Sequence, residues 1–327
     1  MLDDPRLPSI AYVSLDQAQR YAEATVKGSF GLASAEKFWT DRYSHLRSHG
    51  YVLRARYTPD WCPSWLGTNL DPTFCEDSTM LKRHKVIDAI RQHDGSLVAI
   101  KETRNDTEEI GIASFLSSST LMADPRNHLP PLLEVFRGTL DPQTSFMVMP
   151  YLRPFNDPEF GAVGEVVDFV RQSLQGLWFL HEQRVAHRDC AAMNIMMDAR
   201  ALYPSDHHPV RRGYSLNGAN PVTPLARIDH PVRYYLIDFG MSTRFPPGTS
   251  SHVLGTACRD KEVPELSLDV PYAIRRFQGG HLRDGQPVRQ RVCREPLRAG
   301  VPTGPDRPDE ATPARAASVC GRSRPAL

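Results

Sequence analysis

The chain has 327 residues, of which 40% are hydrophobic, and its formal net charge is +1. This length allows one two-lobed domain or two small domains. The near-neutral charge provides no bulk field that would attract nucleic acid or an acidic membrane. Apolar runs such as residues 146–152 are too short to cross a bilayer, and residues 1–9 lack the pattern of a secretory signal.

The six cysteines form no C-x-x-C pair, which argues against a zinc site or a disulfide framework. Cysteines without such pairing are typical of a reducing compartment. We therefore expect a protein of the cytoplasm or nucleus that has neither a membrane nor a nucleic-acid partner.

The first 79 residues are expected to flank the main domain. Ser14 can cap a short helix, and a second helix is predicted over residues 34–49, where aromatic residues and a leucine recur at helical spacing. Residues 51–57 predict a strand, and a loop rich in proline and tryptophan follows it. We interpret these as packing elements, because tryptophans among prolines more often anchor a loop to its own domain.

A β-hairpin is predicted next. Its strands are Val86–Arg91 and Leu97–Lys101, and its turn contains Asp94-Gly95. Residues 107–116 predict a helix, and two more strands are predicted over residues 129–135 and 145–149.

The clearest helix is predicted over residues 163–183. Its apolar side chains form a broad stripe, which is typical of a helix that packs against a core. These side chains are Val166, Val167, Val170, Leu174, Leu177, Trp178 and Leu180.

Two short signatures follow this helix. Residues 187–194 read His-Arg-Asp-Cys-Ala-Ala-Met-Asn, so the carboxylate of Asp189 is followed by the amide of Asn194. Residues 238–240 read Asp-Phe-Gly and place a second carboxylate, that of Asp238, after an apolar strand. Phosphoryl transfer uses one carboxylate to orient the attacking hydroxyl and take its proton, and a carboxylate and an amide to hold Mg²⁺ on the phosphates.

In this order the two signatures resemble the catalytic loop and the Asp-Phe-Gly triplet of the eukaryotic protein kinase family. Val98–Lys101 resembles the third strand of that family, and Val263–Glu265 stands where the family has Ala-Pro-Glu. The resemblance implies an α+β, two-lobed fold with a small β-rich lobe and a mainly helical large lobe. The Pro-Asp-Trp-x-Pro-Ser-Trp stretch at residues 59–65 resembles divergent members of the family from mushroom-forming fungi.

The resemblance covers about residues 80–272 and suggests four parts. They are an N-terminal flanking segment (1–79), the small lobe with its hinge (80–152), a partial large lobe (153–272) and a tail (273–327). The large lobe would carry a surface insertion at about residues 198–231, rich in Pro, His and Asn. Its adjacent His207 and His208 are interpreted as solvated side chains.

The resemblance assigns the nucleotide-binding roles to the small lobe and hinge. Lys101 would contact the α- and β-phosphates of ATP, and Glu109 on the following helix would hold Lys101. Met149 would be the gatekeeper residue. The carbonyl of Pro150 and the N–H of Leu152 would face the adenine.

The resemblance assigns catalysis and metal binding to the two signatures. Asp189 would be the catalytic base, while Asn194 and Asp238 would ligate Mg²⁺. Arg188 would receive a phosphorylated activation segment. The hydroxyls available for that phosphorylation are those of Thr249, Ser250, Ser251 and Thr256.

Three features depart from the family pattern. Residues 75–85 contain no glycine, so no glycine-rich loop precedes the hairpin. Residues 190–193, between the two polar residues of the catalytic loop, include no Lys or Arg, and losing such a charge typically costs on the order of 10²–10³ in rate. Residues 273–327 contain many Arg but no Lys, which predicts disorder and suggests a changed reading frame or a mis-spliced gene model.

We therefore predict an ATP-dependent kinase that phosphorylates Ser or Thr of a protein substrate. A Tyr acceptor stays open, because Ala191-Ala192 resembles the tyrosine-kinase loop although residue 193 is Met and not Arg. A pseudokinase that binds nucleotide or partners is the alternative, and a small-molecule phosphotransferase of related fold is a third.

Overall fold

The computed structural model describes residues 7–249. Its central feature is a five-stranded antiparallel sheet in the order β1-β2-β3-β5-β4. The strands are β1 (Tyr51–Val52), β2 (Val86–Arg91), β3 (Leu97–Arg104), β4 (Glu134–Arg137) and β5 (Thr144–Pro150). The predicted hairpin is confirmed: β2 pairs with β3 from Val86↔Lys101 to Ile90↔Leu97. Gly95 has φ +71°, a left-handed conformation that favours glycine in a tight turn.

The sheet has one face for the core and one for a cavity, because successive side chains of a strand point to opposite faces. Val98 and Ile100 of β3, with Phe146 and Val148 of β5, lie in the main hydrophobic cluster. The alternate residues of both strands, including Lys101, line the cavity described below.

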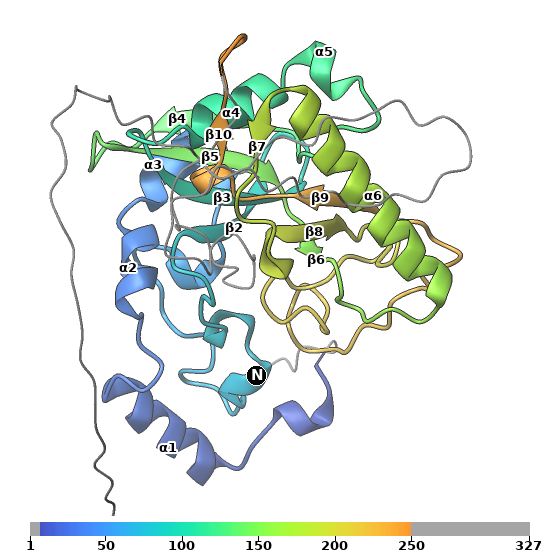
Figure 1. Ribbon diagram of the computed structural model, residues 1–327. Helices are drawn as coiled ribbons and strands as arrows, with labels where there is room; N and C mark the ends of the chain where they lie inside the picture. The colour runs from blue at the N-terminus through green and yellow to red at the C-terminus, as the bar shows by residue number, and fades with distance from the viewer. Residues whose placement is uncertain (1–6, 250–327) are drawn as a thin grey trace, which may run out of the picture. The chain divides into compact units, whose positions relative to one another are not determined.

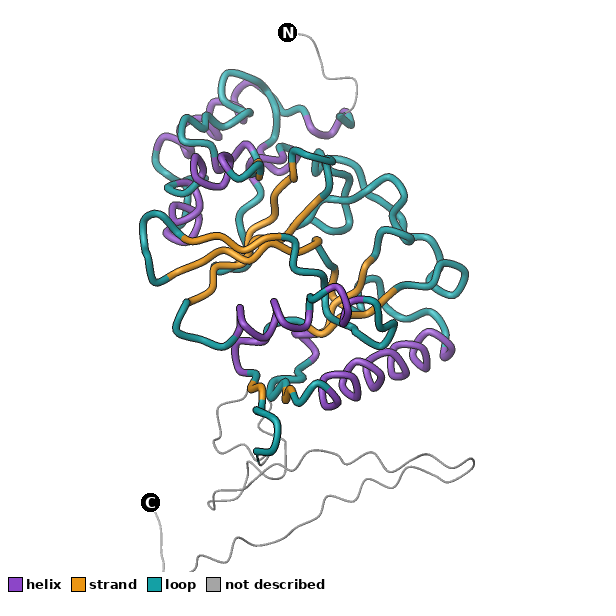
Figure 2. Tube along the Cα trace, turned by 90° about the horizontal axis from the view of Figure 1, so that it is seen from above, coloured by secondary structure: helices purple, strands orange, loops and turns teal. Residues whose placement is uncertain are grey.

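Helices α2 (Ser34–Thr40) and α3 (Tyr43–Ser48) cover the core face of the sheet, and α4 (Glu109–Leu116) lies on the other side (Figure 2). The first helix, α1 (Leu15–Val26), has no buried residue and adds none to the main cluster. Our prediction of one helix over residues 34–49 is wrong. The Arg42 guanidinium donates to the Phe38 carbonyl (2.9 Å), which would otherwise accept from the Arg42 N–H, and the helix breaks there.

The segment upstream of residue 80 supplies part of the sheet and of its core. Trp39, Leu46, Tyr51, Leu53 and Tyr57 are buried in the same cluster as β2, β3 and β5. The predicted strand over residues 51–57 is only partly present, because it ends at Val52 and gives way to a 3₁₀ turn over Ala55–Tyr57.

A buried ion pair holds that turn in place. The Arg56 Nε lies 2.8 Å from Glu36 Oε1, and both side chains are almost fully buried. Next to this pair, Arg54 bonds Asp88 of β2 and Glu76, each at 3.0 Å. These buried ion pairs are made from the turn and from the residue that precedes it.

The rest of the described chain is built around α6 (Val163–Glu182), which runs beside β8 and β9 (Figure 1). A three-stranded sheet has the order β6-β8-β9, and a two-stranded sheet joins β7 to β10. The remaining elements are α5 (Ser119–Met122), β6 (Arg153–Pro154), β7 (Val185–Ala186), β8 (Ile195–Asp198), β9 (Arg233–Leu236) and β10 (Thr243–Arg244). The mixed α+β class predicted from the sequence is confirmed.

The predicted orientation of α6 is wrong, because most of its apolar stripe faces outward. Val167 is 61% exposed and Leu174 is 58% exposed, whereas Phe179 is 1% exposed. Two contacts fix this orientation. The Gln172 amide pairs with the backbone of Val232 and Tyr234, each at 3.0 Å, and Gly176 approaches His128 so closely that a Cβ would lie 2.9 Å from it.

The segment between β8 and β9 contains the predicted insertion. His207 and His208 are buried, so their interpretation as solvated residues is wrong. His208 Nδ1 accepts from the N–H groups of Val210 (3.0 Å) and Arg211 (2.9 Å), and its Nε2 lies 3.0 Å from Glu76 Oε1. Because a backbone amide only donates, Nε2 carries the proton and donates it to Glu76. The insertion is therefore tied to the N-terminal segment.

Within residues 7–249, no helix is long and apolar enough to cross a membrane. Several predictions concern residues outside this range: the possible phosphorylation sites Ser250, Ser251 and Thr256, the Val263–Glu265 triplet, and the tail over 273–327.

Candidate nucleotide and phosphoryl-transfer site

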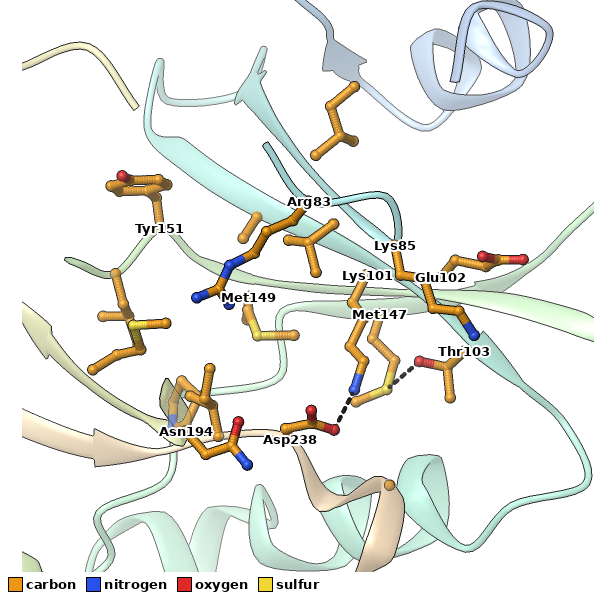
Figure 3. Close-up of a pocket in the computed structure, with 18 of the residues that line it drawn as sticks. Arg83, Lys85, Lys101, Glu102, Thr103, Met147, Met149, Tyr151, Asn194 and Asp238 are labelled. Atoms are coloured by element: carbon orange, nitrogen blue, oxygen red, sulfur yellow. Dashed lines mark hydrogen bonds and ion pairs between the residues drawn. The ribbon is translucent and has the colours of Figure 1, made fainter. Parts of the chain in front are cut away.

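A cavity of about 1180 Å³ opens on the polar face of the five-stranded sheet. It lies between β3 and β5 on one side and the catalytic loop and Asp-Phe-Gly turn on the other (Figure 3). All eight residues singled out from the sequence line this one cavity. They are Lys101, Glu109, Met149, Pro150, Leu152, Asp189, Asn194 and Asp238.

Lys101 stands between two carboxylates. Its ammonium contacts Glu109 Oε1 on α4 and lies 2.9 Å from Asp238 Oδ1. Burial by itself would lower the pKa of Lys101, but the two carboxylates raise the pKa above its ordinary value. Lys101 is therefore a charged, fixed cation within the cavity. Glu108 points elsewhere, because its Oε2 accepts from the Arg244 N–H at 3.3 Å.

Asp189 and Asn194 form a second pair in the catalytic loop, and both are buried. The Asn194 Nδ2 donates to the backbone carbonyl of Asp189 (2.9 Å) and to its Oδ2 (2.8 Å). This bonding orients the Asp189 carboxylate. It also uses only the nitrogen of the Asn194 amide, so the Asn194 oxygen can face a cation.

His187 is a structural link and not a catalytic group. It is buried, and its ring joins the catalytic loop to the strand that precedes Asp238. Its Nδ1 accepts from the Asp189 N–H (3.3 Å), so Nε2 donates to the Ile237 carbonyl (3.0 Å). Burial lowers the pKa of His187, which favours this neutral form.

The Asp-Phe-Gly turn has an uncommon backbone. Asp238 has φ +67° and ψ 72°, a left-handed conformation that residues other than glycine seldom adopt and that often marks functional sites. Phe239 is buried against α4 and α6 and anchors the turn. A Cβ on Gly240 would lie 3.3 Å from Asp238 Oδ1 and 3.5 Å from Glu109 Oε2, so glycine keeps this space open.

The predicted receptor arginine faces the segment that follows this turn. Arg188 also has a left-handed backbone, with φ +67°, and its guanidinium donates to the Thr243 hydroxyl at 3.2 Å. Thr249 donates to the Pro246 carbonyl at 2.7 Å.

The hinge follows β5 directly. Met147 and Met149 both point to the cavity, and the Thr103 hydroxyl contacts the Met147 sulfur at 3.4 Å (Figure 3). Within the described range the Leu152 N–H makes no hydrogen bond, so it can serve a ligand. The Tyr151 hydroxyl donates to the Pro209 carbonyl at 2.6 Å.

Two groups of cavity residues were missed from the sequence. The insertion contributes Pro209, Val210 and Arg212, and the segment before β2 contributes residues 81–85. The signal for the second group was visible as four consecutive basic or histidine residues, 82–85. No local pattern indicated that the insertion would reach the cavity.

Comparison with known proteins agrees with this geometry. A family model described as protein tyrosine and serine/threonine kinase matches residues 82–203. Cyclin-dependent kinase 10 of Bos taurus is 29% identical over 140 residues, which is 40% of this chain. The chain covers 38% of the length of that relative. The relative is bovine, so the likeness to fungal proteins stays a prediction. The chain is thus similar to protein kinases over residues 82–203, and its cavity geometry and α+β architecture agree with that similarity.

Proposed function

We propose that this protein is an ATP-dependent protein kinase that transfers the γ-phosphoryl group to Ser or Thr of a protein substrate. One observation carries the proposal: the Lys101–Glu109–Asp238 cluster and the Asp189–Asn194 pair line the same cavity. Met193, where the tyrosine-kinase loop has Arg, favours Ser or Thr over Tyr as the acceptor.

The residues divide the work of binding between the two sides of the cavity. Lys101, held by Glu109, places a positive charge where phosphate oxygens of ATP would lie. Met149 and the backbone of Pro150 and Leu152 form the edge against which the adenine would pack.

Asp189 is the group that would handle the proton. Its carboxylate, oriented by Asn194, would accept a hydrogen bond from the substrate hydroxyl and take its proton as the oxygen attacks the γ-phosphorus. General-base catalysis of this kind typically accelerates a reaction 10²–10⁴-fold.

The donor set near Asp189 fits Mg²⁺. Asn194 and Asp238 offer an amide and a carboxylate oxygen, the hard ligands that Mg²⁺ prefers. Among the described residues, no group of three or more His, Cys, Asp or Glu could hold a metal alone. That agrees with an ion that completes its shell with phosphate oxygens and water. When bound, Mg²⁺ would neutralise phosphate charge, and Asn194 and Asp238 would hold it.

A pseudokinase is the second candidate, and the catalytic loop itself supports it. Cys190, Ala191, Ala192 and Met193 provide no cation beside the transferred phosphoryl group. Such a protein would use the same cavity to bind nucleotide without turning it over.

A two-part experiment separates the candidates. Thermal-shift titration with Mg-ATP measures binding, and transfer of labelled phosphate to Ser/Thr and Tyr peptides measures catalysis. We expect binding and transfer in the wild type, and binding with transfer reduced about 10²–10⁴-fold in Asp189→Asn. Binding without wild-type transfer identifies the pseudokinase. Absence of both rejects a nucleotide site at this cavity.

A further inference from the structure

The segment that leads into β2 carries a row of cations over the cavity. Residues 82–85 read Lys-Arg-His-Lys, and all four line the cavity. The connection from β1 to β2 has no glycine over residues 75–85, so its backbone lacks the freedom to wrap closely around phosphates. The segment therefore borders the cavity that contains Lys101, but it lacks the glycine backbone that usually binds phosphate.

The backbone of this segment is fixed in place. The Trp39 indole N–H donates to the His84 carbonyl at 3.1 Å, and the Glu102 N–H donates to the Lys85 carbonyl at 2.9 Å. These two bonds hold the main chain at residues 84 and 85, just before β2 begins. The long side chains of Lys82, Arg83 and Lys85 are the charged groups that can reach a ligand.

Those side chains have no partners within residues 7–249. Lys82, Arg83 and Lys85 are exposed, and none of them forms a hydrogen bond or ion pair through its side chain with another described residue. Figure 3 shows the Arg83 guanidinium reaching into the cavity on the side of Met149, while the Lys85 ammonium lies near Thr103. Most other arginines of the described chain are paired with carboxylates or backbone carbonyls, so this unpaired row stands out.

The charges across the cavity are complementary to a polyanion that lies between them. The opposite wall carries the carboxylates of Asp189 and Asp238, and Lys101 is already held by two acids. A polyphosphate with a divalent cation would present its metal to that wall and its remaining oxygens to the three cations above. A guanidinium suits this task, because its fork of N–H donors matches two phosphate oxygens at once.

We propose that Lys82, Arg83 and Lys85 form a polyphosphate-binding rim, which grips the nucleotide by side-chain charges instead of glycine-loop amides. This inference rests on the proposed function, because it names how that site binds its nucleotide. The rim distinguishes ligands by charge: it favours ATP over ADP, AMP and adenosine. Its contribution falls as salt concentration rises, because exposed charges are screened.

The test compares two double variants that lose the same charge. Arg83→Gln/Lys85→Gln removes two rim cations. Lys27→Gln/Lys37→Gln removes two exposed lysines of the N-terminal segment that do not line the cavity. Isothermal titration of the full chain with ATP and with adenosine gives the affinities, and thermal melting without ligand checks that each variant folds.

We expect the rim variant to lose about 10- to 100-fold in affinity for ATP and less than about 2-fold for adenosine. The control variant keeps both affinities. Equal losses for ATP and adenosine, or an unchanged affinity for ATP, overturn the proposal.

Inorganic tripolyphosphate separates this inference from the proposed function. If the wild type binds no nucleotide, the kinase proposal fails. The rim is still supported if the wild type binds tripolyphosphate and Arg83→Gln/Lys85→Gln does not. If tripolyphosphate fails to bind the wild type, or binds the rim variant equally well, the rim is rejected.

Discussion

His207 is a buried imidazole whose protonation would be costly. Its ring stacks on Tyr203, with centroids 4.8 Å apart, and meets Tyr151 edge-on at 5.7 Å. Its Nε2 is buried without a hydrogen-bond partner within the described residues. Burial, and then the nearby Arg153, lower the pKa of His207 to about 4. The folded protein therefore keeps this ring neutral.

The sign of the resulting pH effect follows from the lowered pKa. The unfolded chain takes up a proton near pH 6.5, whereas the folded chain resists it until about pH 4. The contribution of His207 to the free energy of unfolding is thus complete above pH 6.5. It is lost as the pH falls toward 4, by on the order of 3 kcal/mol.

His207→Phe should remove this loss while it keeps the aromatic contacts. We expect the variant to be more stable than the wild type at pH 7 by about 1–2 kcal/mol, since it has no unpaired buried nitrogen. Its advantage should grow as the pH falls from 6.5 to 4. Urea unfolding at several pH values measures this, with His93→Phe in the exposed hairpin turn as control. Parallel curves for the wild type and His207→Phe would contradict the prediction.

At the scale of elements, α6 shows that apolar side chains need not be buried, because most of its apolar stripe is exposed. Its outward stripe contributes little to the core of residues 7–249, whereas Phe179 and Leu180 carry its packing. The free energy of unfolding should therefore change little with substitutions on the outward face and strongly with substitutions on the inward face.

We expect Val167→Gln and Leu174→Gln to change the free energy of unfolding by less than about 0.5 kcal/mol, because both side chains stand in solvent. Phe179→Ala should cost about 3–5 kcal/mol, because it leaves a cavity in the second cluster. Chemical denaturation of the three variants provides the measurement. A large loss from either Gln variant would mean that the outer face of α6 is covered in the full chain.

At the scale of the whole molecule, the N-terminal segment belongs to the fold of the small sheet. It provides β1, the Glu36–Arg56 pair and five of the twelve buried residues of the main cluster. Loss of this segment would expose the core face of β2, β3 and β5 to water.

A chain that begins at residue 80 should therefore not fold cooperatively. A chain that begins at residue 7 should melt like the full chain. Circular dichroism during heating, and the fluorescence of the remaining tryptophan, distinguish the two outcomes. A sharp melting transition from the chain that begins at residue 80 would show that the segment is dispensable.

The parts of this molecule that could be predicted from the sequence are those that depend on short sequence motifs. Three short motifs each place a functional residue type at a fixed spacing, and they can be recognised even where the rest of the sequence differs. They are Val98–Lys101, residues 187–194 and residues 238–240. The cavity then collects these residues, although Lys101 and Asp238 are 137 positions apart.

The remaining features depend on contacts that no local pattern contains. Helix 34–49 breaks because the Arg42 side chain takes a carbonyl of its own helix. Gln172 and Gly176 determine which face of α6 is buried, because they contact residues far away in the sequence. His208 is buried because Glu76, 132 positions away, meets it. For α6 and His208 tertiary packing overrode the local preference, whereas the helix break at Arg42 is set by a side chain of the helix itself.

The contact between His208 and Glu76 has a mechanical consequence. One residue further on, the Tyr151 hydroxyl bonds the Pro209 carbonyl and attaches the insertion to the hinge, where the cleft would open. A restraint near a pivot is stretched little by rotation, since its lever arm is short, but it strongly opposes torsion and sliding. We therefore expect the two sides of the cavity to rotate about the hinge along one path, and to resist twisting and sliding against each other.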